Sequence, residues 1–139
     1  MGHLHKSRAL LVAFLACSSL AHAQGGSSPT STGPIPVPMG STGFKFEIYD
    51  YDPTFLDPDE LLESGEGTFP QPVPPGGNLD IDFKDLYCED GVIKGPAGSS
   101  GEAEAEIYVV VKFIQPNGSV TVTTKTQTVK CSDLPPKPK

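Results

Sequence analysis

The chain has no tryptophan, and its few histidines and its single arginine are confined to the first 23 residues, where His3, His5, His22 and Arg8 lie. The remaining 116 residues contain neither residue type. A serine or cysteine nucleophile activated by histidine is therefore excluded, because the base is missing. Zinc sites that need histidine, and bidentate arginine clamps for phosphate, are excluded for the same reason.

Basic residues are also scarce, since 10 Lys and Arg oppose 17 Asp and Glu and give a net charge of −7. Without the first 23 residues the balance falls to −9, from 8 Lys and 17 acids. Such a surface repels nucleic acid and anionic lipid. Hydrolysis by two carboxylates is the catalytic class that stays open. Such an enzyme normally needs a deep cleft lined with aromatic side chains. A small domain without tryptophan has few residues to form one, so we expect a non-catalytic protein.

The first 23 residues resemble a secretory signal peptide. A basic start precedes an apolar run over residues 9–16, and Ala21 and Ala23 are the small residues that signal peptidase accepts. The alternative is a lipoprotein signal with a lipid on Cys17. The apolar run is shorter than the roughly 20 residues that span a bilayer. We expect cleavage after Ala23, secretion and no membrane span.

Two cysteines, Cys88 and Cys131, follow the signal segment. In an oxidising compartment an even pair predicts one disulfide. Separate thiols, or bridges between chains, are the alternatives. An internal bridge fits a small domain better, because a core of that size is marginal without a covalent link.

Composition divides the rest of the chain into three parts. Residues 24–42 are dominated by Gly, Ser, Thr and Pro, which predicts a flexible, disordered linker. Residues 132–139 are rich in proline and predict a flexible tail. Residues 43–131 between them are expected to form one domain.

Hydrophobic residues within this domain recur at every second position, which is typical of β-strands. The strand segments are residues 44–48, 79–83, 103–114 and, rich in Thr and Val, 120–129. Asn117 and Gly118 separate the last two segments and are typical of a tight hairpin, so we expect these segments to pair antiparallel. Residues 59–63 alone indicate a helical turn. The predicted fold is an all-β antiparallel sandwich with one disulfide and disordered termini.

The predicted hairpin turn also contains a glycosylation sequon, which consists of Asn117, Gly118 and Ser119. In a chain exported by a cell that attaches N-glycans, we expect a glycan on Asn117. A structural explanation for this asparagine is that the turn requires a positive φ there. The two explanations are compatible.

Acidic residues are concentrated between Glu47 and Glu66, where eight acids occur without a base. Converging carboxylates repel one another, and a hard cation with oxygen ligands relieves the repulsion. We therefore expect a calcium site, with the ligands Asp50, Asp52, Asp57, Asp59 and Glu60. The alternative is a solvated acidic turn that supplies solubility. An EF-hand is excluded, because the sixth and twelfth positions from Asp50 are Phe55 and Leu61 instead of Gly and Glu.

Two families share parts of this pattern. A strand that ends in Asp50-x-Asp52, followed by acids and glycine, resembles the third calcium loop of C2 domains. A longer set of segments is similar to secreted transthyretin-like proteins of nematodes: Phe46 to Asp50, Asp57 to Leu62, Gly67 to Phe69, and Leu79 to Cys88. The first resemblance implies calcium ligands at Asp50, Asp52 and one of Asp57 or Asp59. The second implies a secreted β-sandwich with an unspecified ligand.

Together these features predict a secreted, non-catalytic binding or structural module that is assisted by calcium through its acidic loop. Its partner would be an extracellular protein or a small ligand, and not nucleic acid. The alternative is metal-free recognition of a protein or small ligand, as in an effector or an inhibitor. Tyrosine is favoured at interfaces, and the candidates for such a surface are Tyr49, Tyr51, Tyr87 and Tyr108.

Overall fold

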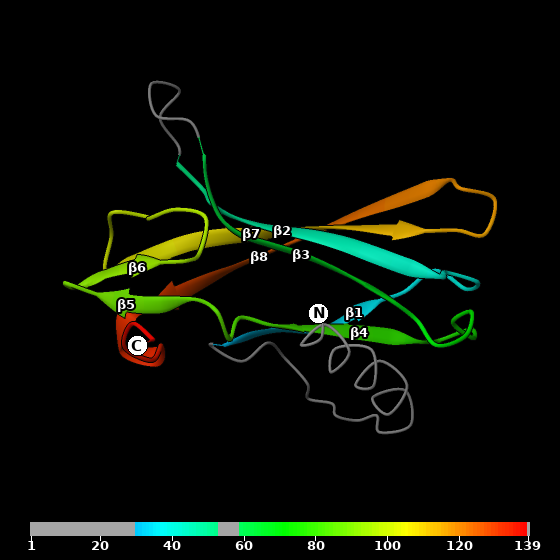
Figure 1. The fold of residues 1–139 in the computed structure, drawn as a ribbon, viewed down its shortest axis with the longest axis horizontal. Coiled ribbons are helices and arrows are strands. Elements are labelled where there is room, and N and C mark those ends of the chain that lie inside the picture. The colour runs from blue at the N-terminus through cyan, green and yellow to red at the C-terminus, as the bar shows by residue number, and fades with distance from the viewer. Residues whose placement is uncertain (1–29, 53–58, 139) are drawn as a thin grey trace.

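The structure, a computed structural model, describes residues 30–52 and 59–138. The predicted signal peptide, residues 1–23, lies outside this part of the chain. The described part contains eight strands and one short 3₁₀ helix (Figure 1). They are β1 Ser31–Pro36, β2 Gly43–Asp50, β3 Glu60–Thr68, β4 Asn78–Asp82, β5 Tyr87–Glu89, β6 Val92–Lys94, β7 Glu104–Ile114, β8 Val120–Lys130 and η2 Cys131–Asp133.

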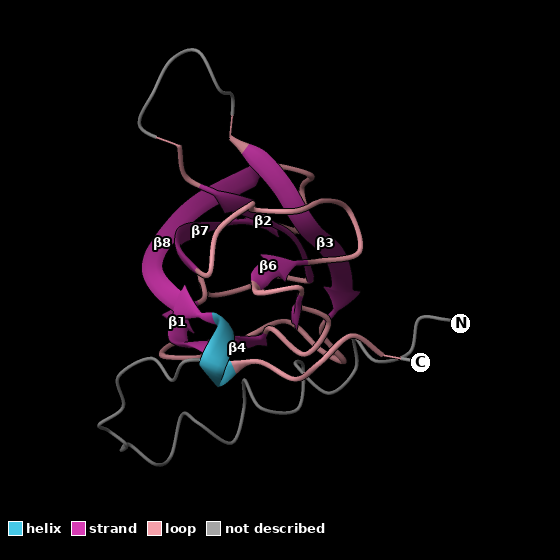
Figure 2. Ribbon diagram, turned by 90° about the vertical axis from the view of Figure 1, so that its left-hand side faces the viewer, coloured by secondary structure: helices cyan, strands magenta, loops and turns pink. Residues whose placement is uncertain are grey.

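The strands form three antiparallel sheets. The largest has the order β3-β2-β7-β8, and two smaller sheets consist of β1 with β4 and of β5 with β6. The four-stranded sheet curls, and the two small sheets lie on its concave side (Figure 2). The all-β, antiparallel, sandwich-like fold predicted from the sequence is therefore confirmed.

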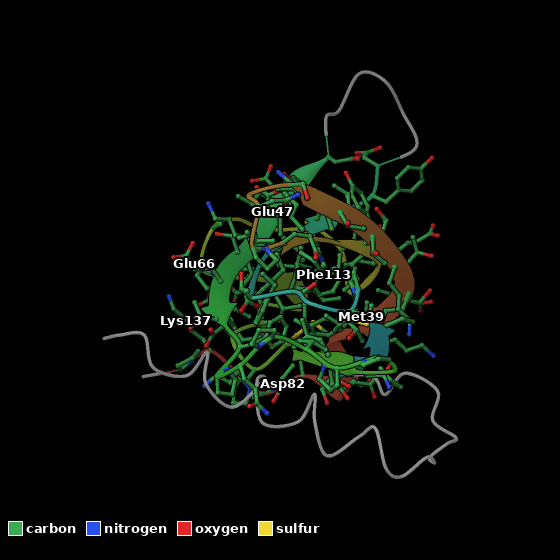
Figure 3. All side chains as sticks on the ribbon, turned by 90° about the vertical axis from the view of Figure 1, so that its right-hand side faces the viewer. Met39, Glu47, Glu66, Asp82, Phe113 and Lys137 are labelled. Carbon is green, nitrogen blue, oxygen red and sulfur yellow. A yellow bond between two sulfur atoms is a disulfide. The ribbon has the colours of Figure 1, made fainter. Side chains whose placement is uncertain are left out.

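The core lies between the curled sheet and the two small sheets. Alternate residues of β7 are buried along its whole length, in agreement with the predicted period of two: Ala105, Ile107, Val109, Val111 and Phe113. Phe44 and Ile48 of β2 and Leu79 and Ile81 of β4 are buried in the same cluster. Figure 3 shows Phe113 inside the molecule and Glu47 and Glu66 at its periphery. Burial of these side chains is the main favourable term for folding.

Two glycines of β3 make room for aromatic rings of β2. Gly65 and Gly67 lie opposite Phe46 and Phe44 in the strand pairing. A Cβ atom at Gly65 would approach the Phe46 ring to 2.6 Å, and one at Gly67 would approach the Phe44 ring to 2.8 Å. Both rings therefore pack directly on the glycine backbone, which explains glycine inside a strand.

The linker prediction is wrong for residues 31–42. Residues Ser31–Pro36 form β1, which pairs with β4, and Ile35 and Val37 are buried. Pro34 and Pro36 are exposed and alternate with these two residues. Proline is tolerated in an extended edge strand. The proline-rich composition therefore concealed a short alternation of buried and exposed residues.

The predicted helical turn at residues 59–63 is also wrong. Residue 59 is irregular, and Glu60 begins β3. A β-bulge interrupts the pairing of β2 with β3 between Ile48 and Tyr49, and both Leu62 and Glu63 are buried beside it. Because a bulge inserts an extra residue, it disturbs the alternation that would reveal a strand in the sequence.

The chain after Cys131 is held against the domain, contrary to the predicted flexible tail. Cys88 N–H donates to the Pro135 carbonyl at 2.9 Å, and Lys137 Nζ lies 3.4 Å from Glu89 Oε2.

η2 is three residues long, and the described residues contain no helix long and apolar enough to cross a membrane.

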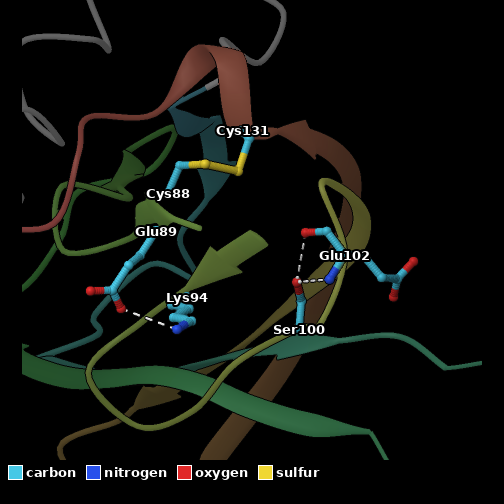
Figure 4. Close-up of a disulfide and its surroundings, with 6 residues drawn as sticks. All are labelled: Cys88, Glu89, Lys94, Ser100, Glu102 and Cys131. Atoms are coloured by element: carbon cyan, nitrogen blue, oxygen red, sulfur yellow. Dashed lines mark hydrogen bonds and ion pairs between the residues drawn. A yellow bond between two sulfur atoms is a disulfide. The ribbon is translucent and has the colours of Figure 1, made fainter. Parts of the chain in front are cut away.

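The predicted disulfide is confirmed. Cys88 of β5 is bonded to Cys131, with the two Cα atoms 5.2 Å apart (Figure 4). The bridge ties η2, at the end of β8, to the small β5–β6 sheet. It therefore connects the curled sheet covalently to one of the sheets that cover its concave side.

Removing this bridge should destabilise the domain substantially. For a sequence separation of 43 residues, the chain-entropy argument gives a loss of about 4 kcal/mol in the free energy of unfolding for the Cys88→Ser/Cys131→Ser double variant. Urea unfolding monitored by tyrosine fluorescence measures this loss. Reductant should bring the parent to the stability of the double variant and leave the variant unchanged. Equal stability of the oxidised parent and the double variant would contradict the prediction.

The acidic end of the sheet, a candidate cation site

Five carboxylates gather where β2 ends and β3 begins. Asp50 ends β2 and lies opposite Glu60, the first residue of β3. The charges of four acids act on the Asp50 carboxylate: Glu102, Asp52, Asp59 and Glu60. We call these five residues the acidic end. It lies at the opposite end of the molecule from the β7–β8 hairpin turn (Figure 1).

Asp50 is the most constrained member of the acidic end. It has 4% of its surface exposed, and Oδ1 has no hydrogen-bond partner among the residues that the structure describes. Burial raises the pKa of Asp50 to about 6, and the charges of Glu102, Asp52, Asp59 and Glu60 act in the same direction. A buried carboxylate without a partner is unfavourable, because desolvation is not compensated.

Glu102 belongs to the acidic end but was not predicted as a site residue. Its N–H donates to Ser100 Oγ at 3.0 Å, and its carbonyl accepts from Ser100 Oγ at 3.1 Å (Figure 4). The carbonyl also accepts from Ile93 N–H at 2.9 Å. These bonds fix the segment just before β7. Antiparallel pairing of β2 with β7 brings the start of one strand to the end of the other, and this is the signal by which Glu102 could have been found.

The Asp59 carboxylate is held by two hydrogen bonds. Tyr108 OH donates to Oδ2 at 2.6 Å, and the Asp52 N–H donates to Oδ1 at 2.8 Å. These bonds lower the pKa of Asp59. Burial, followed by the hydrogen bond to Asp59, raises the pKa of Tyr108 to about 12. Asp59 is therefore an ionised, anchored acid that fixes the chain between Asp52 and β3.

Four of the five predicted calcium ligands are thus brought together, namely Asp50, Asp52, Asp59 and Glu60. Asp57 lies outside the described residues. Within residues 30–52 and 59–138, no group of three or more Asp, Glu, His or Cys is arranged so that it could hold a metal ion. The carboxylates of the acidic end therefore interact through their charges but are not arranged as a coordination shell within the described residues.

The outer face of the sheet carries two of the four candidate tyrosines. Tyr49 and Tyr108 are opposite each other in the β2–β7 pairing and stack with ring centroids 5.1 Å apart. Tyr51 is exposed next to Asp52, and Tyr87 lies in β5 of another sheet. Beyond the tyrosine pair on the same sheet is a depression of about 340 Å³, lined by Lys45, Phe46, Glu47, Ser64, Gly65, Glu66, Val110 and Lys112.

The predicted glycosylation residue lies at an exposed hairpin turn. Asn117 Oδ1 accepts hydrogen bonds from Ser119 N–H at 2.9 Å and from Ser119 Oγ at 2.7 Å. Gly118, with φ of 88°, takes the left-handed conformation, and Asp90 is the non-glycine residue with positive φ in the described ranges. The turn therefore does not require positive φ at Asn117, and that explanation is wrong. Its local role is to accept hydrogen bonds from Ser119.

Comparison with known proteins gives no relative, because no protein-family model, no curated protein and no solved structure matches the chain. The resemblances to C2 domains and to transthyretin-like proteins stay predictions.

A second acid, Glu63, is buried away from solvent. It lies opposite Ile48 in the β2–β3 pairing and has 5% of its surface exposed. Burial raises the pKa of Glu63 to about 8, with further contributions from the charge of Asp85, a hydrogen bond to it, and the charge of Asp82. Burial therefore favours the protonated, neutral form of Glu63 at neutral pH. Sequence reasoning counted Glu63 among the acids of the loop and missed its burial.

Glu63 should make the domain less stable as the pH rises. The folded state keeps this proton up to a pH of about 8, whereas the unfolded chain releases it near 4.5. Its stabilising contribution is complete below pH 4.5 and is lost as the pH rises through 8. The Glu63→Gln variant lacks this titration, so its stability relative to the parent should increase by an amount on the order of a few kcal/mol between pH 5 and pH 9.

Urea unfolding of both proteins across this range tests the expectation. Glu66→Gln, which removes an exposed acid of the same strand, is the matched control. Parallel stability profiles for the parent and Glu63→Gln would show that Glu63 does not titrate differently in the folded and unfolded states.

Proposed function

We propose that the protein is an exported, non-catalytic binding module that binds calcium at the acidic end. The observation that carries this proposal is Asp50, which is buried among four other acids with one carboxylate oxygen that has no partner in the described ranges. A cation at Oδ1 would replace the missing partner and offset the repulsion. Calcium suits this group of oxygens, because it accepts six to eight oxygen ligands in flexible geometry.

Asp50, Glu60 and Glu102 are the residues of this chain that would bind first. Asp50 and Glu60 face each other across the β2–β3 ladder, and the charge of Glu102 acts most strongly on Asp50. Asp59 already uses both carboxylate oxygens in hydrogen bonds, so it would contribute charge and hold the loop. Binding would draw the three carboxylates together, and backbone carbonyls and water would complete the shell.

Calcium should raise the melting temperature of the protein. A ligand that binds the native state alone adds about 2.7 kcal/mol at 100 times its dissociation constant, which is several degrees for a domain of this size. Thermal melts in millimolar calcium, in magnesium and in chelator measure the shift. The Asp50→Asn variant should lose the calcium shift, and Glu66→Gln, outside the acidic end, should keep it. Identical melts of the parent in calcium and chelator would overturn the proposal.

The calcium shift should also depend on pH. The folded state holds the Asp50 proton up to a pH of about 6, above the ordinary value of 3.8. The contribution of that proton to stability is present below pH 3.8 and is lost as the pH rises through 6. Calcium competes with the proton, so the shift measured at pH 7.5 should be larger than the shift at pH 5. A shift that is equal at both values would indicate binding away from Asp50.

A second candidate function is metal-free recognition on the outer sheet face. It is favoured by the stacked pair of Tyr49 and Tyr108 and the depression on the same sheet. Tyrosine is enriched at protein recognition surfaces. Binding of a protein or small ligand that persists in excess chelator and disappears in Tyr49→Ala would support this candidate. In either case we expect no hydrolysis across a panel of glycosides.

A further inference from the structure

The two edges of the four-stranded sheet differ in protection. At one edge, β3 carries the exposed acids Glu60 and Glu66, and Ala97 N–H from the loop after β6 donates to its Leu62 carbonyl at 2.9 Å. Charges and a covering loop are the features that keep sheet edges from pairing with other chains. At the other edge, β8 pairs with β7 alone in the described part of the chain.

Among the described residues, the β8 edge has no covering loop on the half nearest the hairpin turn, and its charged side chains are those of Lys125 and Lys130. Its pairing with β7 runs without a bulge over eleven residues, and the strand contains no proline and no acid. Val120 and Val122 are 51% and 56% exposed, among the most exposed large hydrophobic residues described. A long, regular, β-branched edge of this kind favours the addition of another strand.

The register identifies the backbone groups at this edge. Gln115 N–H donates to the Ser119 carbonyl, and Cys131 N–H donates to the Ala103 carbonyl. Antiparallel ladders alternate, so the odd-numbered residues of β8 bond to β7. The N–H and carbonyl groups of Val120, Val122 and Thr124 point away from it. Farther along, Gln127 Nε2 donates to the Ser31 carbonyl at 3.1 Å, so the open stretch is the half of β8 nearest the hairpin turn.

Charge indicates the partner for this edge. Residues 107–130 contain three lysines and no acid, in a chain with 17 acids. Two copies of an acidic protein repel each other over most of their surfaces. They approach with the least repulsion along this acid-free hairpin, whose turn lies at the opposite end of the molecule from the acidic end (Figure 1).

We propose that the open half of β8 pairs antiparallel with the same segment of a second copy to form a two-fold dimer. A two-fold contact is self-complementary, because each residue pair occurs twice. Centring the pairing on Val122 sets Val122 against its own copy and Val120 against Thr124. Lys125 then faces Ser119, so no lysine faces a lysine. The exposed valines then contact side chains of the partner strand, and the two curled sheets join into one continuous sheet.

Sedimentation velocity over a concentration series that extends to hundreds of micromolar tests this dimer. We expect the parent to change from monomer to dimer across the series. Val122→Lys places like charges opposite each other at the two-fold axis and should weaken dimerisation by about tenfold or more. Thr124→Pro removes an N–H that faces the open edge and should have the same effect, because the ladder with β7 does not use that N–H.

Thr128→Lys is the matched control, because it makes the same change of charge on the same exposed side of β8 but outside the paired segment; it should dimerise like the parent. Amide hydrogen exchange gives a second measurement, which uses the parent alone and so does not depend on whether a variant folds. In the parent, exchange at Val122 and Thr124 should slow as the concentration rises, while Thr123, already bonded to β7, stays protected throughout. If the parent stays monomeric across the series, the β8 edge does not pair with a second copy of this chain, and the proposal is overturned. Equal dimerisation by Val122→Lys would overturn it as well.

Discussion

The pairing of β7 with β2 on one side and β8 on the other is the constraint on which the rest of the structure depends. The buried side chains of β7 form the middle of the core. The ladders of β7 with β2 and with β8 fix the positions of the other strands of the curled sheet. The β2–β7 register brings Tyr49 to Tyr108 and the end of β2 to the start of β7. The acidic end exists because these strands run antiparallel: Asp50 comes last in β2, and Glu102 comes just before β7.

Charge is distributed unevenly along the axis of the molecule. Acids gather at the end where β2 meets β3, whereas the half of β8 nearest the hairpin turn carries no acid. The same asymmetry supports both proposals. A concentration of carboxylates around a buried one favours a cation, and an acid-free, β-branched strand edge is the surface where like-charged copies repel each other least. The functions proposed for the two ends are independent, since neither site uses residues of the other.

Sequence reasoning succeeded where the pattern was local and failed where it was short or interrupted. The long alternation of residues 103–114 and the Asn-Gly turn identified the hairpin. β1 was missed, because three prolines in residues 31–40 concealed the alternation of Ile35 and Val37 with exposed residues. The start of β3 was mistaken for a helical turn, because the bulge at Leu62 leaves two neighbouring residues buried and no period of two.

The sequence by itself determined the all-β class, the hairpin, the pairing of Cys88 with Cys131 and the four acids that gather around β2 and β3. Each follows from spacing along the chain or from the small number of partners available. Only the tertiary structure decided that Glu102 joins those acids, that Oδ1 of the buried Asp50 has no partner among the described residues, and that Glu63 is buried. These features depend on strand register and on one bulge, and a shift of a single residue in either would turn the side chains to the opposite face.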